Sequence, residues 1–202
     1  IPFTINPLLT PSVSLTANNV CLPNATGVTL TAGPTNAGTS PTYKFYIDGT
    51  QVYSGTSPSY SGSVSVGSHS AYVVMTTSVA CPTATTATST TKNFTVANKS
   101  TYSVTLSSPT TICANNNDAG FYANITNVTG DLGTLSYQWY RSGSPVSTSN
   151  PYMAEDLTQG EIIYCRVTSN YWCVTSPVNS PSYTVNISST VTPTVSIQVP
   201  KI

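Results

Sequence analysis

Cysteine is the residue type in this chain whose number and spacing first suggest chemistry. The 202 residues hold five cysteines, and Cys21 to Cys81 and Cys113 to Cys173 are each separated by 60 residues. Equal spacing predicts two equivalent disulfides, one within each of two repeated segments. Closing a loop of this size stabilises a domain by about 4 kcal/mol in the chain-entropy account. Disulfides persist in oxidising compartments, so the pairing predicts an extracytoplasmic location.

Reduced cysteines or a metal site are the alternatives to this pairing. No Cys-x-x-Cys spacing is present, and His69 is the only histidine. The fifth cysteine, Cys165, aligns with Val73 of the first repeat, so we expect a buried free thiol that packs as a small apolar side chain. An intermolecular bridge or a reactive thiol is the functional alternative for Cys165.

Groups for acid–base catalysis are few. A single histidine cannot form a paired site, and no Gly-x-Ser-x-Gly or phosphate-binding glycine loop occurs, so His69 is expected to be structural. Glu155, Asp156 and Glu161 form the one close group of acids that could serve a glycoside hydrolase. The first repeat has serines in the corresponding region, which favours solvated turn charges. We therefore predict that the chain is not an enzyme.

Calcium is the one cofactor that the sequence leaves open. Asp118, Asp131 or Asp156 could supply loop oxygens, but no Asp-x-Asp spacing supports a calcium loop. We expect no cofactor and no metal site.

Aromatic residues give the candidate binding surface. Tyr171 and Trp172 lie beside Cys173, and Tyr53 is a weaker candidate in the first repeat. Exposed rings of this kind stack on sugar faces, which makes surface polysaccharide the candidate partner. The alternative is that the rings pack over a disulfide at the end of a domain or at the joint between domains.

Charge and hydropathy exclude two classes of partner. Only 6% of the residues are charged, and six basic residues balance six acidic ones, so no basic stripe exists to bind nucleic acid. No run of 18 apolar residues occurs, so we expect no membrane insertion in this fragment. Serine and threonine make up about a third of the chain, and hydroxyl side chains on outward strand positions can hydrate a sheet face without charge.

Internal repetition places these residues in domains. The segment Thr10–Leu15 recurs as Thr101–Leu106 and again as Thr192–Ile197, at steps of 91 residues. The predicted domains are therefore the end of a preceding repeat at 1–9, repeat 1 at 10–100, repeat 2 at 101–191 and the start of a following repeat at 192–202. Neighbouring repeats of the same chain are the expected partners.

The repeat unit predicts an all-β fold of about seven strands. Strands are expected in repeat 1 near 11–17, 27–33, 41–47, 50–54, 58–66, 69–78 and 86–97, with matched strands in repeat 2. Asp48-Gly49 and Ser142-Gly143 lie between alternating segments at matched places, as tight hairpins require. Short strands with turns every 8 to 12 residues are typical of β-sandwiches.

Two segments of repeat 2 resemble immunoglobulin-type domains. Tyr137–Tyr140 followed by Ser142–Val146 is similar to their C to C′ hairpin, with Trp139 in the position of the core tryptophan. Gln159–Val167 resembles their F strand and its approach, and repeat 1 carries Phe45 in place of the tryptophan. The resemblance implies two tandem immunoglobulin-like β-sandwich domains. The expected disulfides depart from the family, because the usual bridge between strands B and F is absent.

The whole unit is similar to the tandem repeats of giant surface adhesins of gliding bacteria, of the SprB gliding-motility type, which are cargo of the type IX secretion system. The resembling features are Thr-Pro-x-Val at Thr10 and Thr192, Ile112-Cys113, Tyr-x-(Trp/Phe)-Tyr at Tyr43 and Tyr137, and the segments after Cys81 and Cys173. This resemblance implies an extracellular, cell-surface location and a repeat segment that extends an adhesin from the cell, for gliding or surface attachment. A glycan-binding module, or the stalk of a polysaccharide-degrading enzyme, is the alternative.

Overall fold

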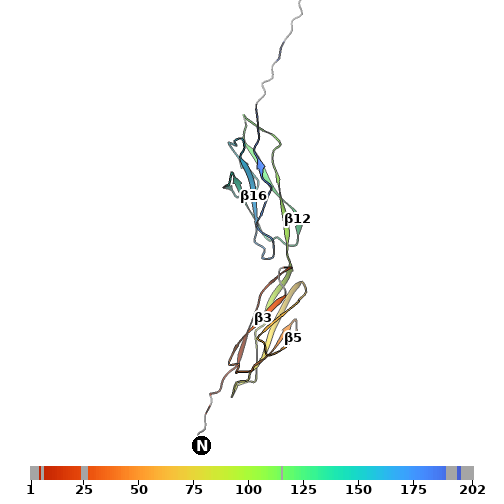
Figure 1. Ribbon diagram of the computed structural model, residues 1–202, viewed down its shortest axis with the longest axis vertical. Coiled ribbons are helices and arrows are strands. Elements are labelled where there is room, and N and C mark those ends of the chain that lie inside the picture. Colours follow the sequence, from red (N-terminus) through yellow and green to blue (C-terminus); the bar gives the residue numbers. More distant parts are fainter. Residues whose placement is uncertain (1–4, 6, 24–26, 115, 190–194, 197–202) are drawn as a thin grey trace, which may run out of the picture. The chain divides into compact units, whose positions relative to one another are not determined.

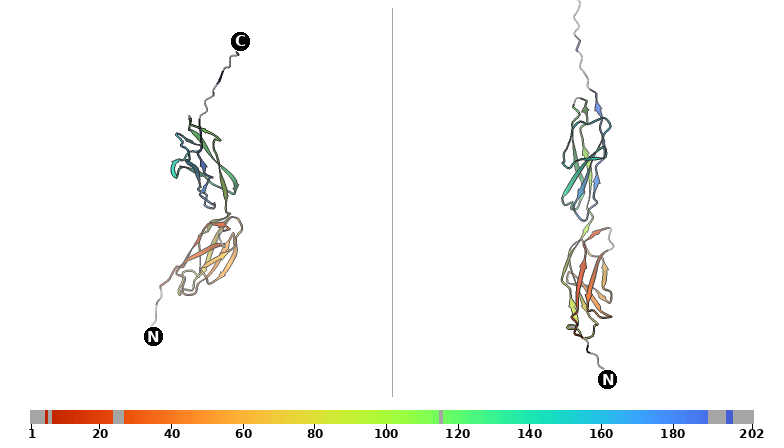
Figure 2. Two further views of the ribbon diagram at one scale, coloured as in Figure 1. Left: turned by 45° about the horizontal axis from the view of Figure 1, so that its top comes forward. Right: turned by 90° about the vertical axis from the view of Figure 1, so that its left-hand side faces the viewer.

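The structure, a computed structural model, describes residues 5, 7–23, 27–114, 116–189 and 195–196. The chain divides into two compact units, Ile1–Lys99 and Ser100–Ile202. The partial repeats predicted at 1–9 and 192–202 lie for the most part outside the described residues. Each unit is built from strands in two packed layers, which Figures 1 and 2 show from three directions.

Unit 1 consists of a three-stranded sheet and a six-stranded sheet. The first has the order β1 (Ser12–Ala17), β3 (Val28–Thr35), β6 (Ser59–Gly62). The second has the order β2 (Val20–Leu22), β9 (Lys92–Asn98), β7 (Gly67–Thr76), β4 (Thr42–Ile47), β5 (Thr50–Gly55), with β8 (Thr86–Thr88) also paired to β7. All pairings are antiparallel except that of β2 with β9, which is parallel.

Unit 2 repeats this arrangement. One sheet has the order β10 (Thr101–Ser107), β12 (Ala119–Thr129), β15 (Tyr152–Ala154). The other has the order β14 (Ser144–Ser147), β13 (Leu135–Arg141), β16 (Ile162–Ser169), β17 (Val178–Asn179), with β18 (Tyr183–Thr184) also on β16. The parallel pair is β11 (Ile112–Cys113) with β19 (Ile187–Ser188). The predicted all-β, immunoglobulin-like sandwich is confirmed in both units.

Alternation along the strands produces the two cores. In β4, Tyr43, Phe45 and Ile47 are buried and Lys44 is exposed, so one face of the strand points inward. Phe45 and Trp139 occupy equivalent places, and neither is exposed at all. The Trp139 ring centroid lies 5.7 Å from that of Tyr152. The position expected for a core tryptophan is therefore confirmed.

The two predicted hairpins have the turn chemistry that their sequences require. Asp48 and Gly49 have φ of 49° and 78°, and Ser142 and Gly143 have φ of 47° and 85°. Positive φ at both central residues is the tight hairpin turn whose twist matches that of the flanking strands. These turns join β4 to β5 and β13 to β14 in antiparallel register.

A buried serine interrupts the last strand of each unit, which the sequence analysis did not foresee. Ser89 Oγ accepts a hydrogen bond from Val73 N at 3.1 Å, and Ser89 N donates to Val73 O at 2.9 Å. Ser180 makes the same two bonds to Cys165, at 2.9 and 2.8 Å. Both serines are only 7% exposed. The strand predicted at 86–97 is thereby split into β8 and β9.

Loss of the Ser89 hydroxyl should destabilise unit 1, and loss of the Ser180 hydroxyl should destabilise unit 2 by a similar free energy of unfolding. Ser89→Ala and Ser180→Ala each leave one buried backbone N–H without its partner, which costs about 1–3 kcal/mol. Both tryptophans lie in unit 2, so denaturant unfolding followed by tryptophan fluorescence should detect Ser180→Ala, and circular dichroism should detect both. The exposed Ser182→Ala is the control, and equal effects of all three variants would contradict this assignment.

Candidate functional site: the two poles of each unit and their cysteines

Each unit has two ends. We call the end where its chain enters the N-pole and the end where its chain leaves the C-pole. In unit 1 the chain enters at the N-pole, where Leu9 N donates to Cys81 O at 3.1 Å. It leaves at the C-pole, where β9 runs beside β2 with Cys21 opposite Ala97. Lys99 N then donates to Leu22 O at 2.8 Å. Unit 1 therefore carries Cys81 at its N-pole and Cys21 at its C-pole.

Unit 2 is arranged in the same way. Its chain begins at the N-pole, where Ser100 N donates to Cys173 O at 2.8 Å. At the C-pole, Cys113 of β11 lies opposite Ser188 of β19. Both units therefore have one cysteine at each pole, and equivalent poles carry equivalent cysteines.

The predicted disulfides Cys21–Cys81 and Cys113–Cys173 are wrong. Cys81 and Cys113 are free and exposed, whereas Cys21 and Cys173 are disulfide-bonded. The reason is distance along the central strands. The ten residues of β7 separate the poles of unit 1, and the eight of β16 separate those of unit 2. At about 3.3 Å per residue these strands span about 30 and about 23 Å, whereas bonded cysteines need Cα atoms within about 7 Å.

Cys165 is the buried free thiol that the alignment with Val73 predicts. It lies in β16 with no exposed surface, and Val73 is equally buried in β7. Burial raises the pKa of the Cys165 thiol to about 11, which keeps it protonated at neutral pH. The thiolate is the reactive form, so Cys165 acts as a core side chain.

Both ring nitrogens of His69 lie within hydrogen-bond distance of an acceptor. Its Nδ1 lies 2.7 Å from Asp48 Oδ2 and its Nε2 lies 2.9 Å from Ser65 O. Both neighbours are acceptors, so both ring nitrogens donate only when the imidazole is protonated. The hydrogen bond to Asp48 raises the pKa of His69, and the same bond, with a second from Ser70 N, lowers the pKa of Asp48.

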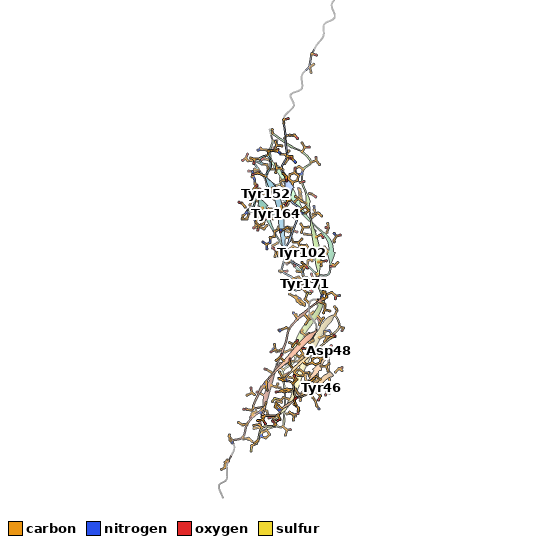
Figure 3. All side chains as sticks on the ribbon, in the orientation of Figure 1. Tyr46, Asp48, Tyr102, Tyr152, Tyr164 and Tyr171 are labelled. Carbon is orange, nitrogen blue, oxygen red and sulfur yellow. The ribbon has the colours of Figure 1, made fainter. Side chains whose placement is uncertain are left out.

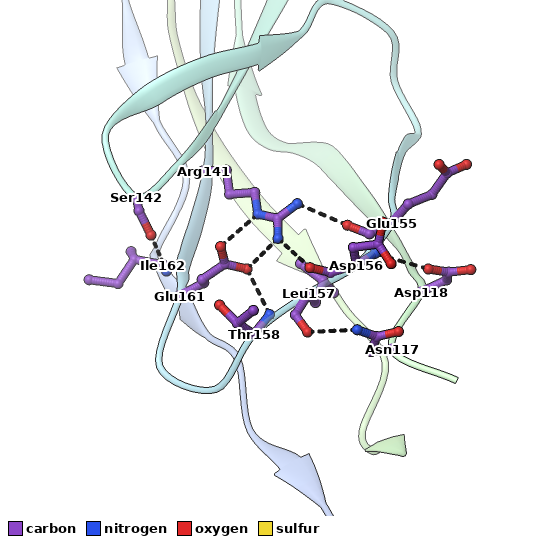
Figure 4. Close-up of polar contacts among 10 residues, drawn as sticks. All are labelled: Asn117, Asp118, Arg141, Ser142, Glu155, Asp156, Leu157, Thr158, Glu161 and Ile162. Atoms are coloured by element: carbon purple, nitrogen blue, oxygen red, sulfur yellow. Dashed lines mark hydrogen bonds and ion pairs between the residues drawn. The ribbon is translucent and has the colours of Figure 1, made fainter. Parts of the chain in front are cut away.

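The acidic residues Glu155, Asp156 and Glu161 belong to a hydrogen-bonded network at the C-pole of unit 2 (Figure 4). Arg141 donates from Nε to Glu161 Oε1 at 2.9 Å, and from its terminal nitrogens to the carbonyl oxygens of Glu155 and Asp156. Glu161 Oε2 also accepts from Thr158 N at 2.9 Å. Burial raises the pKa of Glu161, but the bonds from Arg141 and Thr158 outweigh it, so the pKa is lowered. Glu161 is thus held as an ion-paired carboxylate rather than as a catalytic acid.

Two of the three candidate calcium ligands accept hydrogen bonds from backbone N–H groups. Asp118 Oδ1 accepts from Asp156 N at 3.1 Å, and Asp131 Oδ1 accepts from Gly133 N at 2.8 Å. In the part of the chain that the structure describes, no three His, Cys, Asp or Glu residues lie close enough to hold a metal ion. The same residues contain no helix long and apolar enough to cross a membrane.

The candidate aromatic residues differ in exposure. Trp172 is 43% exposed at the N-pole of unit 2, with its ring centroid 5.9 Å from that of Tyr171, which is half-buried. The ring of Tyr53 instead lies 6.0 Å from Phe45 and 6.3 Å from Tyr60 and packs on the core of unit 1. Only the Tyr171–Trp172 pair therefore offers an exposed ring among the predicted surface residues.

Two stacked tyrosine pairs were missed by the sequence analysis. Tyr46 faces Tyr72 across β4 and β7 with centroids 4.6 Å apart, and Tyr140 faces Tyr164 across β13 and β16 at 4.8 Å. The ring planes are nearly parallel, at 5° and 7°. All four are half-buried on the outward face of their sheet, and Tyr46 and Tyr164 are labelled in Figure 3. Such cross-strand pairs stabilise a sheet by about 0.2–1 kcal/mol each.

The titration of His69 should show its bond to Asp48. As the sole histidine, it gives a single set of imidazole NMR signals, and we expect a pKa above the ordinary 6.5 that falls in Asp48→Asn. Because the folded-state pKa is raised, the stabilisation is complete below pH 6.5 and is lost as the pH rises through that pKa. Asp131→Asn, in unit 2, should leave the titration unchanged. A pKa of 6.5 or lower in the unchanged chain would contradict the geometry.

The three free thiols should differ in reactivity. At neutral pH, a small alkylating reagent is expected to modify Cys81 and Cys113 in the folded chain and to reach Cys165 only after denaturation. Mass spectrometry should show two adducts on the folded chain and a third in denaturant. Rapid modification of Cys165 in the folded chain would show that β16 does not shield it.

Comparison with known proteins finds similarity in solved structures alone. No protein-family model matches the chain, and no curated protein matches it. Fibronectin(III)-like modules of Clostridium thermocellum CbhA match with 15% identity and a TM-score of 0.49, over 86% of this chain and 92% of that one. Domains of the bacteriophage RB49 highly immunogenic outer capsid protein match with 17% identity and a TM-score of 0.39, over 88% and 59%. The four N-terminal Ig domains of Dscam1 isoform 8.4 match with 13% identity and a TM-score of 0.38, over 93% and 46%.

The two units share a strand order, and this order defines the fold of the chain. Each has a three-stranded sheet facing a larger sheet, a tight hairpin after the strand that carries Phe45 or Trp139, and a parallel pairing between a short early strand and the last strand. The chain is a pair of immunoglobulin-like β-sandwich repeat modules.

Proposed function

We propose that the chain is a spacer segment of a large secreted surface protein, in which tandem units extend an adhesive part from the cell for gliding or attachment. The observation that carries this proposal is the path of the chain through each unit. It enters unit 1 beside Cys81 at the N-pole and leaves beside Cys21 at the C-pole. Unit 2 starts at its own N-pole and carries its last strand to its C-pole. Units of this kind add length by repetition, as in other repeat proteins.

The chemistry of the surface supports an extracellular address. Two cysteines are disulfide-bonded, which is typical of oxidising compartments. The exposed strand positions are rich in serine and threonine, so the sheets are hydrated with only 6% charged residues. A surface of this kind suits a spacer that meets water on all sides.

The polar groups of the described residues support a non-catalytic role. His69 is held as a double donor and Glu161 is paired with Arg141, so the two candidate acid–base groups are both engaged in structural contacts. A stalk within a polysaccharide-degrading enzyme would use the same units, and a catalytic domain elsewhere in the full gene product would identify that case.

Replacing both units on the cell separates spacing from specific binding. Deleting 10–191 should impair attachment of cells to a surface, because the adhesive part is held closer to the cell. Two unrelated sandwich domains of similar size in the same place should restore attachment. Antibodies against the units should label intact cells. Labelling only after permeabilisation, or failure of the replacement despite normal surface display, would overturn the proposal.

Glycan binding at the Tyr171–Trp172 pair is a second candidate function. The exposed Trp172 ring favours it, because aromatic faces pack against the apolar faces of sugars. Titration calorimetry with soluble surface polysaccharide should give saturable binding, which Trp172→Ala abolishes. Val146→Ala is a matched control, since Val146 is also 43% exposed in unit 2. Binding that survives Trp172→Ala would exclude this site.

A further inference from the structure

The outward face of the sheet β10–β12–β15 in unit 2 carries two exposed apolar side chains. Tyr122 of β12, the strand labelled in Figure 1, is 49% exposed, and Met153 of β15 is 65% exposed. Both point away from the core, because their chain neighbours Phe121, Tyr152 and Ala154 are buried. Exposed apolar side chains that adjoin one another, unlike single ones, point to a contact surface.

A glycine between these two side chains opens a groove. Gly120 pairs with Met153 across β12 and β15, and it lies two residues before Tyr122 on the same face of β12. A Cβ atom at Gly120 would lie 3.2 Å from Met153 Sδ and 3.8 Å from Tyr122 Cε2, so both side chains lean over its bare backbone. The groove measures about 420 Å³ and is lined by Ser107, Ser108, Pro109, Gly120, Tyr122 and Met153.

The rim of the groove is fixed and supplies hydroxyl groups. Ser107 lies opposite Tyr122 across β10 and β12, and its Oγ accepts from Asn124 Nδ2 at 2.8 Å. A serine hydroxyl both accepts and donates, so Ser107 can still donate to a ligand. Pro109 O accepts from Tyr183 Oη at 3.3 Å, which ties this part of the rim to the core of unit 2.

Unit 1 carries hydroxyl side chains at the same four places of its three-stranded sheet. The residues in the register of Ser107, Gly120, Tyr122 and Met153 are, in that order, Thr16, Thr29, Thr31 and Ser61. Thr29 Oγ1 lies 3.1 Å from Ser61 Oγ, so these two side chains bond to each other. The fold therefore does not require a glycine, a tyrosine or a methionine at these places, and their presence in unit 2 needs another reason.

We infer that this groove binds a neutral saccharide chain. Its six lining residues carry no charge, which disfavours an ionic ligand. Tyr122 and Met153 offer apolar surface to the C–H face of a sugar ring, and the rim hydroxyls can bond to its hydroxyl groups. The volume lies within the range of about 300–1,000 Å³ that is usual for small-molecule sites. The site requires only the fold of unit 2, so it stands apart from the proposed spacer role.

A peptide strand fits the same groove less well. The floor of the groove is β12, which is paired with β10 on one side and with β15 on the other. Its backbone groups are used within the sheet and cannot pair with an added strand. The groove therefore offers side-chain contacts, which suit a sugar ring.

Methyl NMR of the whole chain reports on the groove directly, because the chain has two methionines. Met153 lines the groove, whereas Met75 is buried in the core of unit 1 and is an internal control. With isotope-labelled methionine methyl groups, at least one of cellohexaose, laminarihexaose and mannohexaose should shift the Met153 signal saturably at up to about 10 mM. The Met75 signal should stay in place.

Three results of this titration would overturn the saccharide site. The first is that none of the three sugars shifts the Met153 signal. The second is that both methionine signals shift equally, which would report a change of the whole chain. The third is that the Met153 signal responds only to a uronic acid oligomer or to an apolar dipeptide, which would assign the groove to another class of ligand.

Two substitutions taken from unit 1 test the groove itself. Gly120→Thr fills its floor and Tyr122→Thr removes its ring, and each should weaken binding by about tenfold or more through lost apolar contact. Gly120→Thr can fold because the flexible Met153 side chain can move aside. If it does not fold, Tyr122→Thr decides alone, since this side chain is half-exposed.

Val128→Ala is the matched control for these variants. Val128 is 51% exposed on the same strand β12 but does not line the groove, so its loss should leave binding unchanged. Denaturant unfolding followed by tryptophan fluorescence checks that unit 2 is folded in each variant, since both tryptophans lie there. Full binding by the folded threonine variants, or an equal loss in Val128→Ala, would contradict the assignment.

Discussion

The length of the central strands β7 and β16 is the constraint on which the rest of the structure depends. Each strand runs between the two poles of its unit, so groups at opposite poles are separated by about 23–30 Å. Cysteines placed at opposite poles cannot bond within a unit. The same distance separates the points where the chain enters and leaves, so each unit adds its own length to the path. The absence of disulfides within each unit therefore follows from one dimension of the fold, and the proposed spacer role rests on the same dimension.

The two units reach the same architecture with different core side chains. Unit 1 surrounds Phe45 with Tyr53 and Tyr60, whereas unit 2 surrounds the larger Trp139 with Phe121 and Tyr152. The central strand carries Val73 in one unit and Cys165 in the other, and each is bonded through its backbone to a buried serine. Cores tolerate such exchanges when volume and pattern are kept. The polar contacts to the backbone, Ser89 and Ser180, are kept unchanged.

The sequence predicted the fold because strand alternation and turn chemistry are local signals. The hairpins at Asp48-Gly49 and Ser142-Gly143 and the core position of Trp139 were correct for this reason. The cysteine pairing was wrong because equal spacing in sequence reports equivalent positions in a repeat and says nothing about the distance between them. The stacked pairs of Tyr46 and Tyr140 could have been noticed, since each tyrosine recurs at a matched place in both repeats. The short strand β2 carries too few residues to show a pattern.

Tryptic mapping of the unreduced chain tests the central claim most directly, because the six basic residues place each of the five cysteines in its own peptide. Free thiols are blocked at low pH in denaturant before digestion. The structure predicts that peptides 45–92 and 100–141, which carry Cys81 and Cys113, are recovered alkylated. Linkage of 1–44 to 45–92, or of 100–141 to 167–201, would contradict it.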